Sequence, residues 1–175
     1  MRNVLRPGLA LAMLGLSASP ASGAVSGNFS VLANVASSCQ IVGSIADLDF
    51  GSYDPLGGSA KTGQTAINVR CSLLLPYTVK LNAGQHSGND FSARRMQNQS
   101  DETHYLSYNL YTLAGCGPAN LWGDGTATTT TVGGIGSGLL SGITPASHTV
   151  YGCMPAGQEA LPGSYSDTVT VTITY

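Results

Sequence analysis

Carboxylate side chains are the first candidates for chemistry in this sequence. Hydrolysis of a glycosidic bond needs two carboxylates on opposite sides of the sugar bond, one of them with a raised pKa. Asp49 and Asp124 could form such a pair. Most of the acidic residues, however, stand beside Gly, Pro or Ser, where a carboxylate ordinarily accepts hydrogen bonds from turn backbone. We therefore expect turn roles for these residues, which are Asp47, Asp49, Asp54, Asp90, Asp101, Glu102, Asp124, Glu159 and Asp167.

The histidines and glycine-rich runs add no catalytic motif. His86, His104 and His148 stand in or beside expected loops and strands, without a nucleophile motif. The sequence has no Gly-x-Ser-x-Gly elbow and no His-Glu-x-x-His zinc motif. The run GGIGSG at 133–138 lacks the Lys-Ser/Thr that follows a phosphate-binding loop. We predict that the protein is not an enzyme and has no catalytic residue, cofactor or metal site.

Aromatic side chains offer an alternative function, carbohydrate binding. Trp122 with Tyr105, Tyr108 and Tyr111 could form a platform on which sugar rings stack. On the strands of a sandwich, such aromatics more often fill the core or cover a sheet edge. A secreted carbohydrate-binding module therefore stays an alternative.

Four cysteines, Cys39, Cys71, Cys116 and Cys153, are the remaining reactive groups. No two of them have the spacing of zinc ligands, which disfavours a zinc site. An even number of cysteines in an exported chain predicts two disulfides. Three pairings are possible, and we expect the sequential one, Cys39–Cys71 and Cys116–Cys153. Each bridge would close a loop of about 30–40 residues and stabilise the fold by about 3–4 kcal/mol.

Export is predicted by residues 1–24. Arg2 and Arg6 form a positive amino-terminal region, and a short apolar stretch follows at 9–16. Ser22 and Ala24 provide the small side chains that precede a signal-peptidase cleavage site. The apolar stretch is shorter than the roughly 20 residues that cross a bilayer. We predict a cleaved signal peptide and no stable membrane insertion.

The composition is that of an exposed β-protein. Only 9% of the 175 residues are charged, and Ser, Thr, Asn and Gly supply most of the polarity. A formal net charge of −2 does not attract a polyanion, which argues against nucleic acid as a partner. The length corresponds to one domain.

The last stretch of the chain has the clearest strand pattern. From Tyr165 onward, Ser or Thr occupies the even positions, and the odd positions include Val169, Val171 and Ile173. This alternation predicts a strand with its valines and isoleucine toward a core and its threonines toward water. No turn or further strand follows in the sequence. We therefore expect an unpaired edge that needs a partner from another molecule.

Residues 25–36, directly before the first cysteine, form a second alternating segment. The even positions are mostly polar, with Leu32 the one clear exception. The pattern predicts either an ordinary first strand or a strand that detaches to pair elsewhere. Its odd positions are Val25, Gly27, Phe29, Val31, Ala33 and Val35.

Between these segments the sequence predicts short strands and no helix. We expect strands at 63–72, 77–81, 105–111, 121–125 and 148–154, a long loop at 82–101, and a β-segment followed by a loose loop at 126–144. Seven or eight strands at this spacing predict an all-β, immunoglobulin-like antiparallel sandwich.

Six short motifs follow one another in an order that resembles a known family. They are LDFGSYDP at 48–55, VRC at 69–71, YLSYNLY at 105–111, WGDG at 122–125, VYG at 150–152 and GSYSDTV at 163–169. The sequence resembles the spore coat protein U domain family, which includes subunits of archaic chaperone–usher pili of Gram-negative bacteria. The resemblance implies an incomplete immunoglobulin-like sandwich that lacks its last strand, a donor strand before the first cysteine, and a Cys39–Cys71 disulfide. Cys116 and Cys153 depart from the family, in which the position of Cys153 is often basic.

The resemblance and the two alternating segments together predict polymerisation by donor-strand complementation. We expect a donor segment at 25–38 and a sandwich domain at 39–175. The odd residues of 25–35 would insert beside Val169, Val171, Ile173 and Tyr175 of an identical or related subunit, head to tail.

The family further implies how such a subunit would reach the cell surface. Its expected partners are a periplasmic chaperone and an outer-membrane usher, and its expected location is a surface fimbrium that supports adhesion or biofilm formation. A spore or cell coat protein of the same fold that forms no pilus is the alternative.

Overall fold

The computed structural model describes residues 22–139 and 144–175, so most of the expected signal peptide lies outside the described residues. The chain divides into two units, Met1–Asn34 and Val35–Tyr175. In the first unit, residues 22–34 form no strand and are exposed. The alternative of an ordinary first strand at 25–36 is therefore wrong, and a strand that pairs elsewhere stays a prediction. A lone extended segment has no neighbouring backbone with which to form a ladder, whereas a second molecule could provide one.

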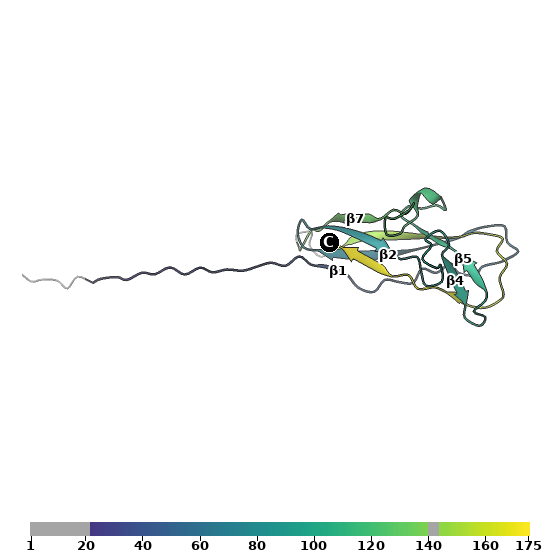
Figure 1. The fold of residues 1–175 in the computed structure, drawn as a ribbon, viewed down its shortest axis with the longest axis horizontal. Helices are drawn as coiled ribbons and strands as arrows, with labels where there is room; N and C mark the ends of the chain where they lie inside the picture. Colours follow the sequence, from purple (N-terminus) through teal and green to yellow (C-terminus); the bar gives the residue numbers. More distant parts are fainter. Residues whose placement is uncertain (1–21, 140–143) are drawn as a thin grey trace, which may run out of the picture. The chain divides into compact units, whose positions relative to one another are not determined.

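The second unit contains ten strands among its described residues (Figure 1). They are β1 (Cys39–Ile41), β2 (Lys61–Cys71), β3 (Pro76–Leu81), β4 (Arg95–Asn98), β5 (Tyr105–Ser107), β6 (Asn109–Tyr111), β7 (Val132–Ile135), β8 (Ala146–Met154), β9 (Tyr165–Ser166) and β10 (Val171–Thr174). A single 3-10 turn, η1 (Pro118–Asn120), precedes Trp122. The all-β, immunoglobulin-like prediction is confirmed.

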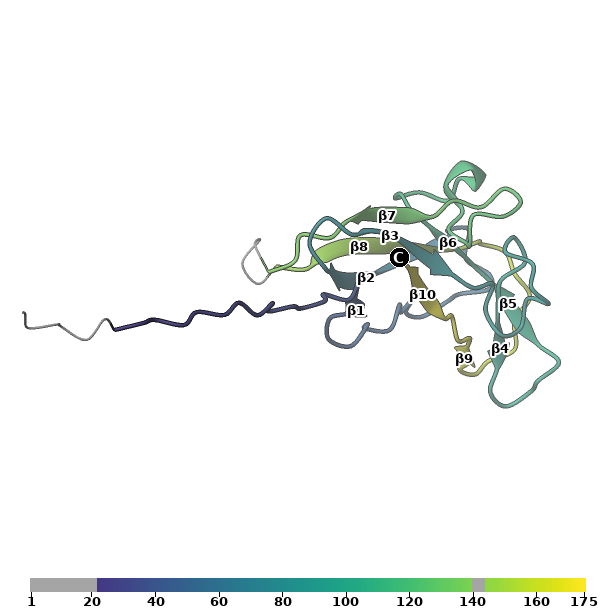
Figure 2. The same cartoon turned by 60° about the vertical axis from the view of Figure 1, so that its left-hand side comes forward.

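The strands form three antiparallel sheets. Their strand orders are β1-β2-β8-β6, β10-β3-β7 and β5-β4-β9. The small third sheet lies at one end of the domain, and β1 lies toward the other (Figure 2). In the second sheet, β10 occupies an edge with β3 as its neighbour.

The core forms between the first two sheets because their inward positions are apolar. Ile67 and Val69 of β2 and Val79 of β3 are each at most 1% exposed. Trp122 is fully buried among them, and its indole N–H donates to the Val79 carbonyl oxygen at 3.2 Å. The alternation predicted for β2 and β3 therefore buries the expected faces, Ile67, Val69 and Cys71 on β2 and Tyr77, Val79 and Leu81 on β3.

Three predicted elements differ from the structure. The loop expected at 82–101 contains β4, and the strand expected at 105–111 is two strands in different sheets, separated at Tyr108. Tyr108 donates its backbone N–H to the Arg94 oxygen and its O–H to Asp167, which holds it at the crossing between sheets. Residues 121–125 form isolated bridges instead of a strand.

Both disulfides have the sequential pairing. Cys39–Cys71 joins directly paired residues of β1 and β2. Cys116–Cys153 joins the segment after β6 to β8, the neighbour of β6 in the sheet. The additional bridge therefore connects neighbouring parts of one sheet.

A pH effect on stability is expected from His148. Its Nε2 lies 2.9 Å from the Tyr77 hydroxyl, and burial lowers the pKa of His148 below its usual value. The unfolded histidine binds protons near pH 6.5, so its contribution to stability is present above that pH and is lost as the pH falls through the lower folded pKa. The melting temperature of the His148→Gln variant should therefore fall less between pH 7 and pH 5 than that of the parent protein. An equal loss in both proteins would contradict this role, since all other titrating groups are shared.

Candidate functional site: an apolar groove beside the last strand

An apolar groove separates the edge strand β10 from the segment that follows β1. One part of it, the β10 cavity, has a volume of about 620 Å³. Its walls are residues 45–50 on one side and 165–169 with Val171 on the other. Its floor is the buried core itself, contributed by side chains that include Ile67, Leu81 and Val150. These floor residues are at most 3% exposed, so the groove lies directly over the closed core.

The walls carry apolar side chains that are themselves left partly exposed. Ile45, Leu48 and Phe50 on one wall and Val169 and Val171 on the other are only partly buried, although all pack against the core cluster. A completed sandwich would cover such inward-facing side chains with another strand. The two walls therefore leave apolar side chains for a further element to cover.

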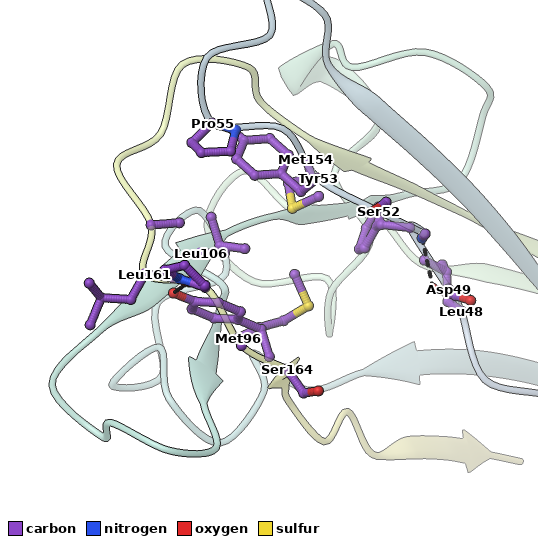
Figure 3. Close-up of a pocket in the computed structure, with 16 residues that line it drawn as sticks. Leu48, Asp49, Ser52, Tyr53, Pro55, Met96, Leu106, Met154, Leu161 and Ser164 are labelled. Carbon is purple, nitrogen blue, oxygen red and sulfur yellow. Dashed lines mark hydrogen bonds between the residues drawn. The ribbon is translucent and has the colours of Figure 1, made fainter.

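A second cavity continues the groove toward the end that carries β4, β5 and β9. We call it the methionine cavity; its volume is about 600 Å³. Figure 3 shows the side chains of Met96, Met154 and Leu106 directed toward this space. The two cavities share Leu48, Asp49, Phe50, Met96 and Tyr165, which makes them parts of one groove. Methionine side chains adapt their shape to different apolar partners.

The backbone of β10 is available along the groove. The Asn82 N–H donates to the Thr170 oxygen, and Thr172 pairs with Lys80 in the same register. Because backbone direction alternates along an antiparallel strand, the amides and carbonyls of Val171 and Ile173 point away from β3. No strand among residues 22–139 and 144–175 pairs with that edge. Val171 and Ile173 therefore present both an inward side chain and outward backbone groups.

Asp167 fixes the junction between β9 and β10. Its side chain is only 2% exposed. It accepts hydrogen bonds from the Tyr108 hydroxyl at 2.7 Å and from the Gln85 N–H at 2.9 Å. Burial and the bond to Asp167 raise the pKa of Tyr108, so the hydroxyl keeps its proton. This contact ties the groove wall to two other segments and explains why the final alternating stretch is two strands in different sheets.

Gly84 leaves room for this anchor. Its φ is +85°, and a Cβ at this position would collide with the Asp167 Oδ2. Gly84→Ala should therefore destabilise the domain by about 1–2 kcal/mol through backbone strain and by about 1–3 kcal/mol more through overpacking. Gly88→Ala is the matched control, because Gly88 has φ +68° with open space around it. An equal loss of stability in the two variants, measured by urea unfolding, would contradict the role of Asp167 as an anchor.

The predicted site residues occupy two regions. The odd residues of the amino-terminal segment are all exposed. Of the predicted acceptor residues, Val169 and Val171 line the groove, Ile173 packs against the core, and Tyr175 lies beyond β10 and is 58% exposed. The opposite wall was not predicted. A sequence pattern that could have indicated this wall is the alternation of Asp47, Leu48, Asp49 and Phe50, which is typical of a half-buried strand.

The residues weighed for chemistry have structural contacts instead. Asp49 accepts the Gly51 N–H at 2.7 Å (Figure 3). Asp124 accepts the N–H and hydroxyl of Thr126, and these bonds lower the pKa of Asp124, opposite to the shift that a general acid needs. Trp122 is 0% exposed, so its ring offers no stacking surface for a sugar.

Within 22–139 and 144–175, no group of three or more His, Cys, Asp or Glu side chains is arranged to hold a metal ion. No helix in this part of the chain has the length and apolar character to cross a bilayer.

Comparisons with known proteins agree with the motifs. A model of the Spore Coat Protein U domain matches residues 25–172. Protein U of Myxococcus xanthus is 35% identical over 170 residues, which span 90% of this chain and 89% of Protein U. A solved relative is the CsuC–CsuE chaperone–tip adhesion subunit pre-assembly complex from archaic chaperone–usher Csu pili of Acinetobacter baumannii.

That structural match concerns the fold. Its TM-score is 0.56 at 23% identity, and it covers 81% of this chain but 40% of the solved chain. The family match, in contrast, extends through the groove walls and the amino-terminal segment from residue 25. The chain therefore belongs to the Spore Coat Protein U domain family.

Proposed function

We propose that this protein is a structural subunit that polymerises into a surface fibre by donor-strand complementation. The observation that carries the proposal is the groove, which has core residues as its floor and an unpaired strand edge as one wall. The donor is residues 25–35 of a second copy, and the acceptor is the groove beside β10. Each subunit gives and receives one strand, so the contact is head to tail and propagates.

The donor segment fits the groove in chemistry and length. Phe29, Val31 and Val35 are 85–90% exposed in the single chain. Burying three such side chains gives roughly 5–9 kcal/mol, before the backbone ladder with Val171 and Ile173 is counted. Residues 25–35 are also longer than the four-residue strand β10, so one donor can cover its whole free edge.

The exposed groove explains the need for assembly partners. An apolar channel beside an unpaired strand is a template for aggregation. A periplasmic chaperone that lends a strand and an outer-membrane usher that exchanges it would protect the subunit until the next donor arrives. The solved relative is itself a chaperone–subunit complex. On this proposal the protein is exported through the periplasm, is not an enzyme, and supports adhesion or biofilm formation as part of a fimbrium.

Deletion of residues 25–36 tests the function. The truncated chain keeps the groove and should still be captured by the chaperone, but it has no strand to donate and should not extend a polymer. Co-purification measures capture, and sedimentation measures polymer length. Either loss of capture or normal growth of the polymer would overturn the proposal.

A coat protein that forms no pilus is the second candidate function. The match to the Spore Coat Protein U domain favours it, since the same strand exchange would build a layer instead of a fibre. Electron microscopy of the surface of expressing cells distinguishes the two, because a pilus extends as a filament and a coat covers the surface.

A further inference from the structure

Exposed apolar side chains gather at the turn between β2 and β3. Leu73, Leu74 and Ile135 are 50%, 76% and 68% exposed. The Leu74 N–H donates to the Gly136 oxygen at 2.7 Å, and Ile135 pairs with Pro76, so these residues belong to adjacent backbone segments. We call these three residues the turn patch. Exposed apolar groups of this kind mark interaction surfaces.

Leu74 contributes little to the isolated domain. Its φ is +59°, a left-handed conformation that a bulky side chain rarely adopts and that Gly or Asn adopts more easily. Its side chain is also mostly in water. The unfavourable conformation of Leu74 is therefore not offset by burial of its side chain within the domain.

The turn patch lies beside the point where the donor segment leaves the domain. The Ser38 N–H donates to the Ser72 Oγ at 3.0 Å, and the Ser72 N–H donates to the Ser38 oxygen at 2.8 Å. If Val35 is the last inserted residue, three residue steps separate it from Ser38, a span of at most about 11 Å. The subunit that receives the donor must therefore approach the turn patch.

The strand direction defines which part of the neighbour arrives there. A donor that continues the antiparallel order of the β10-β3-β7 sheet runs opposite to β10, so its residue 35 lies near Tyr165 of the acceptor. That end of the groove is the methionine cavity. Leu161 lines this cavity and is 41% exposed, and Leu56, next to its lining residue Pro55, is 96% exposed.

We propose that the turn patch of each subunit packs against Leu56 and Leu161 of the second copy that receives its donor strand. Successive subunits would then be held together by this apolar contact as well as by the inserted strand. The proposal rests on the proposed function, because it takes the donor connection as given.

Assembly of the mature full-length chain tests the contact. Leu74→Asn relieves the backbone conformation, so the monomer should melt at the same or a higher temperature. The critical concentration for polymer growth should nevertheless rise by roughly tenfold, the effect of losing one buried leucine contact. Leu56→Asn should raise it similarly. Leu113→Asn, an exposed leucine outside both surfaces, is the matched control and should leave it unchanged.

The outcomes separate this inference from the proposed function. An unchanged critical concentration in either Leu74→Asn or Leu56→Asn would overturn the inference, even with polymers present. Polymer growth in a chain that lacks residues 25–36 would instead overturn donor-strand exchange itself. Selective loss of assembly in Leu74→Asn and Leu56→Asn, with the control unaffected, supports the contact.

Discussion

Moving residues 25–35 from the amino terminus to a position after Tyr175 is expected to convert a polymerising chain into a stable monomer. A short Asn-Gly loop after β10 would turn the appended segment back along the edge of β10 as an antiparallel hairpin. Its apolar residues would then cover the groove of their own domain. No donor would remain for a neighbour.

The expected gain in stability is large because the insertion buries several apolar side chains at once. Relative to a chain without residues 25–35, the free energy of unfolding should rise by about 5 kcal/mol or more. Urea unfolding measures the gain, and light scattering measures the mass. Appending the same segment with Val31→Asp is the control and should give little gain. A rearranged chain that still forms long polymers would contradict the assignment of donor and acceptor.

The second large effect is expected from Val31→Asp in the otherwise unchanged chain. Val31 is 85% exposed in the single chain, so the substitution should leave the stability of the monomer unchanged. In the polymer it would place a carboxylate in the groove without a partner, at a cost of several kcal/mol. Since 1.4 kcal/mol is a factor of ten, assembly should weaken by at least about a hundredfold.

Ser30→Asp provides the matched control for this effect. Ser30 is the even-numbered neighbour of Val31 and would face water when the odd residues face the groove. Sedimentation of the two variants over a concentration series should show polymers for Ser30→Asp and monomers for Val31→Asp. Equal assembly of both variants, or selective failure of Ser30→Asp, would contradict the predicted face.

Most of the fold could be predicted because its core strands have local signals. The alternation of Ile67, Val69 and Cys71 and of Tyr77, Val79 and Leu81 is visible without any knowledge of their partners, and these faces are buried. Two of the failures involve contacts between distant residues. The breaks at Tyr108 and Asp167 coincide with a hydrogen bond between these two residues, 59 positions apart, which local patterns do not contain.

Half of the candidate site could be predicted from the sequence. The β10 wall has the period-two pattern of a strand, whereas residues 45–50 form no strand in the structure and become a wall only through their position against the core. The methionine cavity is even harder to predict from the sequence. Met96 lies in β4, within a stretch whose polar composition predicts a loop, and meets Met154 only after folding.

Hydrogen exchange of the β10 amides tests strand insertion most directly. In the monomeric Val31→Asp chain, the amides of Val171 and Ile173 point to the unpaired edge and should exchange rapidly, while that of Thr172 faces β3. In the assembled parent chain, Val171 and Ile173 should become strongly protected, with little change at Thr172. Polymers in which Val171 and Ile173 exchange as rapidly as in the monomer would contradict insertion of a neighbour's strand beside β10.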